Sequence, residues 1–258
     1  MSEPRVADYD NVADRYDRRY TLLRYDGVRD ALINFLGEGR PRVLEVGCGT
    51  GHWLGVAQPR AGRAAGVDLS SGMLARARAA LPPSIPILQA RAEDLPWIDA
   101  AFDRIYCINA LHHFSDRFRF FIEARRLLRP GGGLLTVGKD PHAERDDWWV
   151  YDYFPETVAI DRARFAPVRI LRGELARAGF DWAESMEADR IEATHTAAEA
   201  FAGGMVDRAH TSQLTVLSDE EFDRGVARIR EADAAVDGQL QLVTDFRLFA
   251  TIGWLAGP

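Results

Sequence analysis

The run VLEVGCGTG at residues 43–51 is the feature that most constrains the fold of this chain. A short apolar segment passes directly into three glycines at alternate positions, which predicts a buried strand that ends in a tight loop. Glycine tolerates a positive φ and lets a ligand approach the backbone closely. We expect a helix from about His52, with its free N–H groups directed at the loop. The run predicts a ligand-binding loop of an α/β fold, with an ordinary tight turn as the alternative.

The acidic residue before the glycines narrows the class of ligand. The spacing differs from the GxGxxG loop of dinucleotide sites, and no lysine completes a GxxxxGK[ST] phosphate loop. Glu45 would repel a phosphate and attract an ammonium group. The sequence therefore favours a ligand that carries an ammonium group.

Short apolar runs alternate with helical patterns from about Arg42 to Val137. This alternation indicates a parallel sheet with helices on both faces, and such sheets bind ligands beyond the carboxyl ends of their strands. The helical patterns are Ser71–Leu81, with Ser70 or Ser71 as the N-cap, and Phe118–Leu128. The expected strands are Val43–Val46, Ala64–Val67, Ile85–Leu88, Arg104–Ile108 and Leu134–Val137.

The segments outside this core predict a single domain over residues 1–258. Residues 1–36 read as N-terminal helices, residues 140–240 as a helical cap, and residues 244–255 as a closing strand. No internal repeat or low-complexity linker separates them. Within the cap we expect a helix and a strand near Ile170–Glu187 and helices around Ala197–Val206 and Asp219–Ala235.

Acidic residues follow the second and third predicted strands. Asp68 ends the second strand, where a carboxylate accepts both hydroxyls of a ribose in nucleotide-binding α/β folds. Met73, on the next helix, is placed to pack on a purine face, although a plain core position is the alternative. Asp94 is placed to accept a hydrogen bond from an exocyclic amine above Leu95, with a solvated loop as the alternative.

Five motifs, in order, resemble those of the class I S-adenosylmethionine-dependent methyltransferases. They cover about residues 42–138 and are most similar to the branch of ubiquinone/menaquinone-biosynthesis and small-molecule enzymes. The resemblance implies S-adenosyl-L-methionine as cofactor and a Rossmann-like fold, with a mostly parallel seven-stranded sheet, helices on both faces and a helical cap. The motifs are VLEVGCGTG, VDLS, AEDLPW, FDRIYCINALHHF and LLRPGGGLL, and YDNVADRYDRRY resembles the segment that covers the cofactor in this branch.

Carried over by position, the resemblance assigns contacts to each part of the cofactor. The glycine loop would hold the methionine moiety, Glu45 its amino group and Asp68 the ribose. Asp94 would bond the adenine N6, Asn109 would lie beside the sulfonium, and Tyr16 would cover the cofactor. The complete set that it implies is Tyr16, Glu45, Gly47, Cys48, Gly49, Gly51, Asp68, Leu69, Met73, Glu93, Asp94, Leu95 and Asn109.

Candidate catalytic and substrate-binding residues follow the fourth and fifth predicted strands. His112 and His113 come shortly after Asn109, and an imidazole suits proton abstraction near neutral pH, with His113 preferred as the base. A capping or packing role is the alternative for either histidine. From the aromatic stretch 146–154 we expect Trp148, Trp149 and Tyr153 to contact the substrate, or else to anchor the cap.

Several classes of partner are disfavoured by the sequence. The net charge of −7 and the absence of an Asn-Pro-Pro motif after the fourth strand argue against a nucleic-acid substrate. No clustered acids predict a catalytic metal, and Cys48 and Cys107 have no metal-binding or disulfide spacing. No apolar run is long enough to span a membrane, and no leader pattern opens the chain, so a cytoplasmic protein without a membrane partner is expected.

The leading functional hypothesis is methylation of a small organic molecule by in-line displacement. One alternative keeps the fold and the cofactor for a non-methylating reaction, a cyclisation or a rearrangement. Another is methylation of a protein or of RNA. The sequence leaves open the identity of the acceptor, the atom that is methylated and the oligomeric state, a homodimer included.

Overall fold

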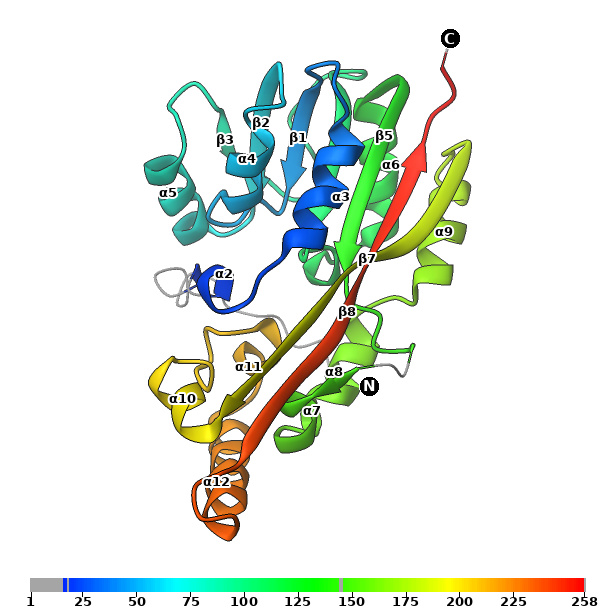
Figure 1. The fold of residues 1–258 in the computed structure, drawn as a ribbon. Coiled ribbons are helices and arrows are strands. Elements are labelled where there is room, and N and C mark those ends of the chain that lie inside the picture. The colour runs from blue at the N-terminus through cyan, green and yellow to red at the C-terminus, as the bar shows by residue number, and fades with distance from the viewer. Residues whose placement is uncertain (1–15, 18, 144–145, 258) are drawn as a thin grey trace.

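We analysed a computed structural model, which describes residues 16–17, 19–143 and 146–257 (Figure 1). Part of the expected N-terminal helical segment, residues 1–15 and 18, therefore lies outside the described residues. Its described part contains helix α2 (Arg19–Leu22) and helix α3 (Asp26–Leu36), so a helical reading holds for that part. No helix in the described ranges combines the length and the apolar character that crossing a bilayer requires.

Five parallel strands form the body of the sheet, as the alternating pattern predicts. They are β1 (Arg42–Val46), β2 (Arg63–Asp68), β3 (Ile87–Gln89), β4 (Phe102–Ile108) and β5 (Leu128–Gly138). The strand order β3-β2-β1-β4-β5-β8-β6 puts the first strand in the middle of the parallel part. The chain therefore reverses direction beside β1, which is where α/β sheets bind their ligands.

Three antiparallel strands complete the sheet, one more than the seven-stranded expectation allows. Strand β8 (Gln241–Trp254) pairs with β5, with β7 (Trp182–Thr196) and with the two-residue β6 (Asp147–Trp148). The additional strand forms because β8 continues well beyond the end of β5, and that free stretch pairs with Asp147 and Trp148. The expectation of seven strands is corrected to eight within the described residues.

Two apolar cores lie on the two faces of the parallel strands. Successive residues of β1 alternate between them: Val43 belongs to the core with α3, and Leu44 to the core with α6 (Arg117–Leu127). Helices α4 (His52–Ala57) and α5 (Ser71–Ala80) pack on the α3 side, and α9 (Val168–Arg177) packs on the α6 side. Helix α5 starts as expected, because the Ser70 side chain accepts a hydrogen bond from the Met73 N–H at 3.1 Å.

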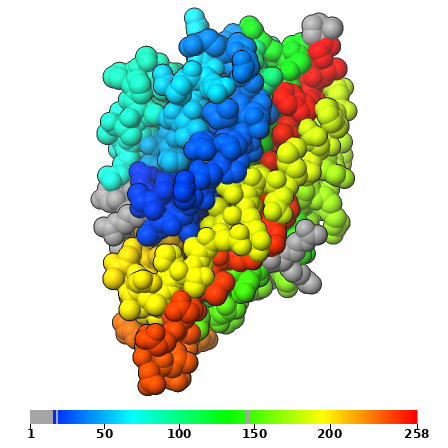
Figure 2. Space-filling model, in the orientation of Figure 1, coloured from blue at the N-terminus to red at the C-terminus, as the bar shows by residue number. Residues whose placement is uncertain are grey.

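The lower part of β7 and β8 carries the remaining helices, a region that we call the extension (Figure 1). These helices are α7 (Trp149–Tyr153), α8 (Glu156–Arg164), α10 (Ala197–Ala202), α11 (Ser212–Thr215) and α12 (Asp219–Ala235). Helix α12 has its predicted bounds, whereas α10 ends earlier than predicted, before Gly203 and the left-handed Gly204. In Figure 2 the N-terminal segment lies directly against β7, where the Val28 N–H donates to Asp189 at 3.1 Å.

Candidate functional site

A cavity of about 400 Å³ opens at the carboxyl ends of β1, β2 and β4. Its position is the one that the strand order predicts for a ligand site. Most of the sequence-predicted cofactor residues line it, and so does one of the two histidines. These predicted residues are Tyr16, Glu45, Gly47, Cys48, Gly49, Asp68, Leu69, Met73, Glu93, Asn109 and His113.

The glycine loop uses its glycines in different ways. A Cβ atom at Gly47, where φ is +76°, would lie 2.5 Å from the Ala110 Cβ, so only glycine fits between the loop and the segment after β4. A Cβ at Gly49, where φ is +52°, would meet no protein atom within 4 Å. The backbone of Gly49 therefore faces the open space of the cavity. Gly51, also predicted to bind the cofactor, does not line the cavity but begins α4.

Asp68 is fixed at the end of β2 by two backbone donors. One carboxylate oxygen accepts from the Gly49 N–H at 2.8 Å, and the other accepts from the Ser70 N–H at 2.9 Å. A carboxylate has about four acceptor directions, so it can bond further donors beside these two. The strand end, the glycine loop and the start of α5 are thus tied to one carboxylate that lines the cavity.

Glu45 is a buried carboxylate in the wall of the same cavity, with only 1% of its surface exposed. Burial, together with the charge of Asp68, raises the pKa of Glu45 well above its usual range, and the Tyr106 hydroxyl donates to it at 3.4 Å. Three carboxylates line the cavity, those of Glu45, Asp68 and Glu93, whereas Arg91 is its single charged cation among the described residues. Such a cavity attracts a positively charged ligand.

The two histidines lie on different sides of the loop after β4. His113 lines the large cavity, and burial with the charges of Arg164 and Arg19 lowers its pKa to about 3. Burial and the same cations also lower the pKa of His112, which stacks on Phe165 with ring centroids 3.9 Å apart and lines no part of the large cavity. Both imidazoles are therefore neutral near pH 7.

Comparison with known proteins places this geometry in a family. A family model described as a methyltransferase domain matches residues 44–136. A ubiquinone/menaquinone biosynthesis C-methyltransferase of Bordetella avium is 30% identical over 174 residues, 61% of this chain and 68% of that protein. A 27-O-demethylrifamycin SV methyltransferase of Amycolatopsis mediterranei is 33% identical over 99 residues, 36% of each chain, so this match spans about a third of the relative's length.

Solved structures share the fold at lower sequence identity. A putative methyltransferase from an antibiotic biosynthesis pathway of Anabaena variabilis has a TM-score of 0.67 at 23% identity, over 87% of this chain and 95% of that one. The YcgJ protein of Bacillus subtilis has a TM-score of 0.61 at 19% identity, over 91% of this chain and 100% of that one. The chain belongs to the class I S-adenosylmethionine-dependent methyltransferases. The family resemblance and the Rossmann-like fold inferred from the sequence motifs are confirmed.

The cavity of this methyltransferase suits the cofactor that the family implies. S-adenosylmethionine combines a ribose with an ammonium group and a sulfonium, and the carboxylates of Asp68 and Glu45 complement these groups. Open space over the Gly49 backbone leaves room for close contact with a ligand. The Met73 side chain is 2% exposed and packs with Ala209 and Tyr16 at the cavity wall.

Two of the predicted adenine contacts lie elsewhere in this methyltransferase. Leu95 is 2% exposed, but it packs in the core with α6 and its N–H donates to Glu123 at 3.2 Å. Asp94 is exposed and does not line the cavity. Glu93 does line it, and accepts hydrogen bonds from the Ser115 hydroxyl at 2.7 Å and from the Asp116 N–H at 3.0 Å. The structure brings Glu93 to the cavity, rather than Asp94 or Leu95.

We call the large cavity of about 400 Å³ the cofactor cavity. Two smaller chambers lie next to it. The larger, of about 60 Å³, shares Asn109 with the cofactor cavity. The smaller, of about 30 Å³, shares His112, Lys139 and Phe165 with the larger one. Asn109 has a left-handed backbone conformation, with φ at +52°, and it lines both the cofactor cavity and the larger chamber.

The three aromatic residues expected to bind substrate have different positions. Trp148 lines the larger chamber. Trp149 is 1% exposed and packs inside the core with Phe154. Tyr153 lines none of the three spaces. The positions of these two residues fit the alternative that they anchor the cap. The short helix α7 turns these two side chains away from the chamber.

Sequence reasoning missed several residues that line these spaces. In the cofactor cavity they include Thr50 and Phe114, and in the chambers Lys139, Arg164 and the segment 211–213. Lys139 had one available signal, since it is the only lysine of the chain and directly follows β5. Within the described residues, no three His, Cys, Asp or Glu side chains gather closely enough to hold a metal ion.

Proposed function

We propose that this methyltransferase transfers the methyl group of S-adenosyl-L-methionine to a small organic molecule. The observation that carries the proposal is the small chamber that adjoins the cofactor cavity at Asn109. A chamber of about 60 Å³ has room for a short chain or for one end of a small molecule, since a benzene ring needs a cavity of about 150 Å³. Relatives named for quinone and rifamycin methylation, which act on small molecules, support the same class of acceptor.

The residues that hold the cofactor in this proposal surround the large cavity. Asp68 accepts the ribose hydroxyls, Glu45 lies near the amino group, and the loop around Gly49 contacts the methionine moiety. Met73 and Leu69 flank the adenine, and Tyr16 covers the cofactor. When bound, S-adenosylmethionine supplies an electrophilic methyl group on a positively charged sulphur.

The chain contributes mainly positioning and exclusion of water. Asn109 lies where the cofactor cavity meets the larger chamber, and His113 lines the cofactor cavity after the same strand, so in this proposal both contact the reacting end of the acceptor. The neutral His113 imidazole accepts a proton only from an acceptor that is itself acidic, because its conjugate acid is disfavoured by burial and by Arg164. His112 stacks on Phe165 and so holds this ring in the chamber wall.

The proposal is tested by following the methyl group. The purified protein is incubated with S-adenosylmethionine carrying a labelled methyl group and with a cell extract separated into its ultrafiltrate and its macromolecular fraction. We expect label in a small product of the ultrafiltrate and an equal amount of S-adenosylhomocysteine. Label in protein or RNA contradicts the small-molecule acceptor, and consumption of a substrate without S-adenosylhomocysteine indicates a non-methylating reaction.

A further inference from the structure

The two inner chambers differ in charge from the cofactor cavity. Every charged side chain that lines them in the described part of the chain is a cation: Arg19 and Lys139 in the larger chamber, and Arg117, Lys139 and Arg164 in the smaller one. The cofactor cavity is lined mainly by carboxylates. A cationic lining favours an anionic occupant, so the charge changes sign between the space for the cofactor and the chambers beyond it.

Arg164, in the wall of the smaller chamber, has unused hydrogen-bonding capacity. It is the last residue of α8, and its side chain is 4% exposed. One nitrogen, Nη2, donates to Asp161 at 2.7 Å, but Nε and Nη1 are buried and have no hydrogen-bond partner. Burying unsatisfied guanidinium N–H groups destabilises a protein unless a ligand accepts from them. Because Arg164 lies in a chamber wall, these N–H groups are available to an acceptor group that enters the chamber.

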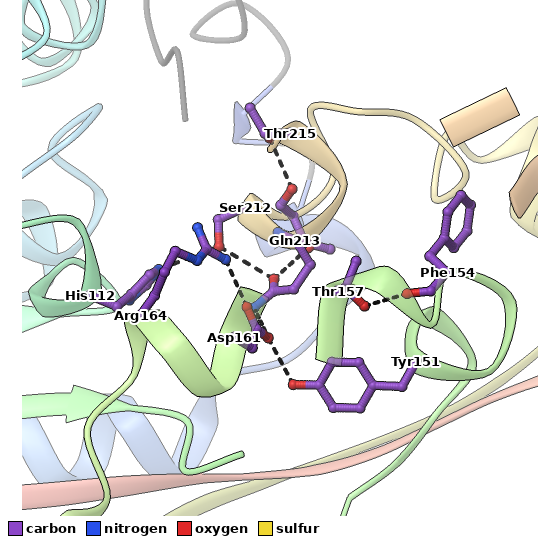
Figure 3. Close-up of polar contacts among 10 residues, drawn as sticks. His112, Tyr151, Phe154, Thr157, Asp161, Arg164, Ser212, Gln213 and Thr215 are labelled. Carbon is purple, nitrogen blue, oxygen red and sulfur yellow. Dashed lines mark hydrogen bonds and ion pairs between the residues drawn. The ribbon is translucent and has the colours of Figure 1, made fainter. Parts of the chain in front are cut away.

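A buried polar cluster fixes Arg164 in this position (Figure 3). Asp161 is fully buried and accepts from the Tyr151 hydroxyl and from Gln213 Nε2, each at 2.8 Å, as well as from Arg164. Figure 3 shows the Arg164 side chain beside His112, with its guanidinium directed toward Asp161 and next to Ser212. The Asp161 carboxylate accepts from three donors and bonds only one nitrogen of Arg164. It therefore fixes the arginine and leaves its other two nitrogens without a partner.

Lys139, by contrast, already has partners. Its ammonium lies 3.1 Å from an Asp146 carboxylate oxygen and 3.9 Å from the centre of the Trp148 ring. Asp146 lies behind the lysine and does not line either chamber. Lys139 therefore adds positive potential to both chambers, while Arg164 has the N–H groups that a ligand can use.

We propose that Arg164 binds a carboxylate of the methyl acceptor, so that the acceptors of this enzyme are small organic acids. The smaller chamber has room for roughly two to three water molecules, the size of a carboxylate, and the larger one takes the body of the acceptor. Nε–H and Nη1 point from different edges of the guanidinium, so either one can donate a charge-assisted hydrogen bond to a carboxylate oxygen. This inference rests on the proposed function, because it assigns the acceptor of that same reaction.

The test uses the protein saturated with S-adenosylhomocysteine, which keeps probes out of the cofactor cavity. Benzoate, hydroxybenzoate and butyrate are each compared with the corresponding amide by ligand-observed NMR titration. We expect at least one carboxylate to bind about tenfold or more tightly than its amide. Arg164→Gln should remove this preference, whereas Arg162→Gln, which deletes the same charge from an exposed position of α8, should retain it.

Arg164→Lys keeps a cation beside Asp161, so it should fold even if Arg164→Gln does not. A single ammonium held by Asp161 lacks the separately directed Nε–H and Nη1–H groups, so this variant should lose most of the preference. Equal binding of every carboxylate and its amide by the wild-type protein overturns the inference, as does an unchanged preference in Arg164→Lys. Failure of the wild-type protein to bind S-adenosylhomocysteine contradicts the proposed function instead. The two failures are therefore distinguishable.

Discussion

At the scale of single residues, the Asp68 carboxylate connects the glycine loop to α5 and faces the cofactor cavity. We expect Asp68→Ala to weaken S-adenosylhomocysteine binding by about 1.5–3 kcal/mol, the usual range for hydrogen bonds to a charged group. Asp68→Asn, which retains one acceptor oxygen, should lose less. Isothermal titration calorimetry measures both changes, and a dissociation constant of the alanine variant within about twofold of the wild type would refute the role of Asp68.

The raised pKa of Glu45 leads us to expect that cofactor binding is coupled to the loss of a proton from this residue. Its pKa in the free protein is raised by burial, and an ammonium group beside it would favour the ionised form. Binding should therefore release a proton, and the affinity for S-adenosylhomocysteine should rise with pH until the raised pKa is passed. Calorimetry in buffers of different ionisation enthalpy detects the released proton. Glu45→Gln should abolish it, and an unchanged release in that variant contradicts the assignment.

The lowered pKa values of two histidines, His113 and His210, allow a prediction of how stability depends on pH. The pKa is about 3 for His113 and about 4 for His210 in the folded protein, against about 6.5 in an unfolded chain. Between these values the unfolded state binds more protons, so the free energy of unfolding should fall as the pH drops below about 6.5. Chemical denaturation at several pH values measures the slope. His113→Asn should flatten it, and a wild-type slope near zero between pH 6.5 and 5 would contradict the burial of these rings as neutral species.

At the scale of elements, the local patterns predicted what local chemistry decides. The strand into the glycine loop, α5 with its Ser70 cap and α12 over Asp219–Ala235 all follow from periodicity and capping residues. What the sequence could not decide is which side of an element faces a cavity. Leu95 and Trp149 are apolar residues beside ligand-binding spaces, but both are packed in cores, because tertiary packing and not their own segment sets their direction.

The inner chambers illustrate the same limit. Their walls come from the end of β4, the segment after β5, helix α8 and helix α11, which are separated by many residues in the sequence. No single motif contains Lys139, Arg164 and Gln213 together. The family motifs end near residue 138, so the resemblance could place the cofactor but not the groups that meet the acceptor.

The close contact of Gly225 with Phe154 allows a prediction about how α12 packs within the extension. A Cβ at this position would lie 2.1 Å from two ring atoms of the fully buried Phe154. Gly225→Ala should therefore lower thermal stability even though alanine favours a helix over glycine by about 1 kcal/mol. Gly173→Ala in α9 is the matched control, because a Cβ there meets nothing within 4 Å and should leave stability unchanged or raise it. Equal melting temperatures for the two variants would contradict this packing.

At the scale of the whole molecule, the charge is divided between two spaces that meet at Asn109. The chain has a net charge of −7, but the charged side chains that line the inner chambers are cations, whereas those that line the cofactor cavity are mainly carboxylates. A positively charged cofactor and an anionic acceptor would thus be drawn to different sides of the same junction. Under the proposed function, the two reactants would meet at this junction without competing for one site.

Occupation of the large cavity should stabilise the entire fold, because the cavity joins β1, β2, β4, α5 and the N-terminal segment. At about 100 times its dissociation constant, a ligand adds about 2.7 kcal/mol. For a chain of 258 residues this corresponds to a rise in melting temperature of roughly 5–10 °C. Scanning calorimetry of the wild-type protein with and without S-adenosylhomocysteine measures this rise.

Gly49→Val should remove that rise, for a reason specific to the cavity. The valine side chain would meet no protein atom within 4 Å at its Cβ, so it would occupy ligand space rather than clash with the fold. Its φ of +52° costs a β-branched residue about 1–2 kcal/mol, so the unliganded melting temperature should also fall modestly. Gly39→Val, where a Cβ also meets nothing within 4 Å but no cavity lies, should retain the full ligand-induced rise. A wild-type rise in the Gly49→Val variant would mean that the ligand does not approach this loop.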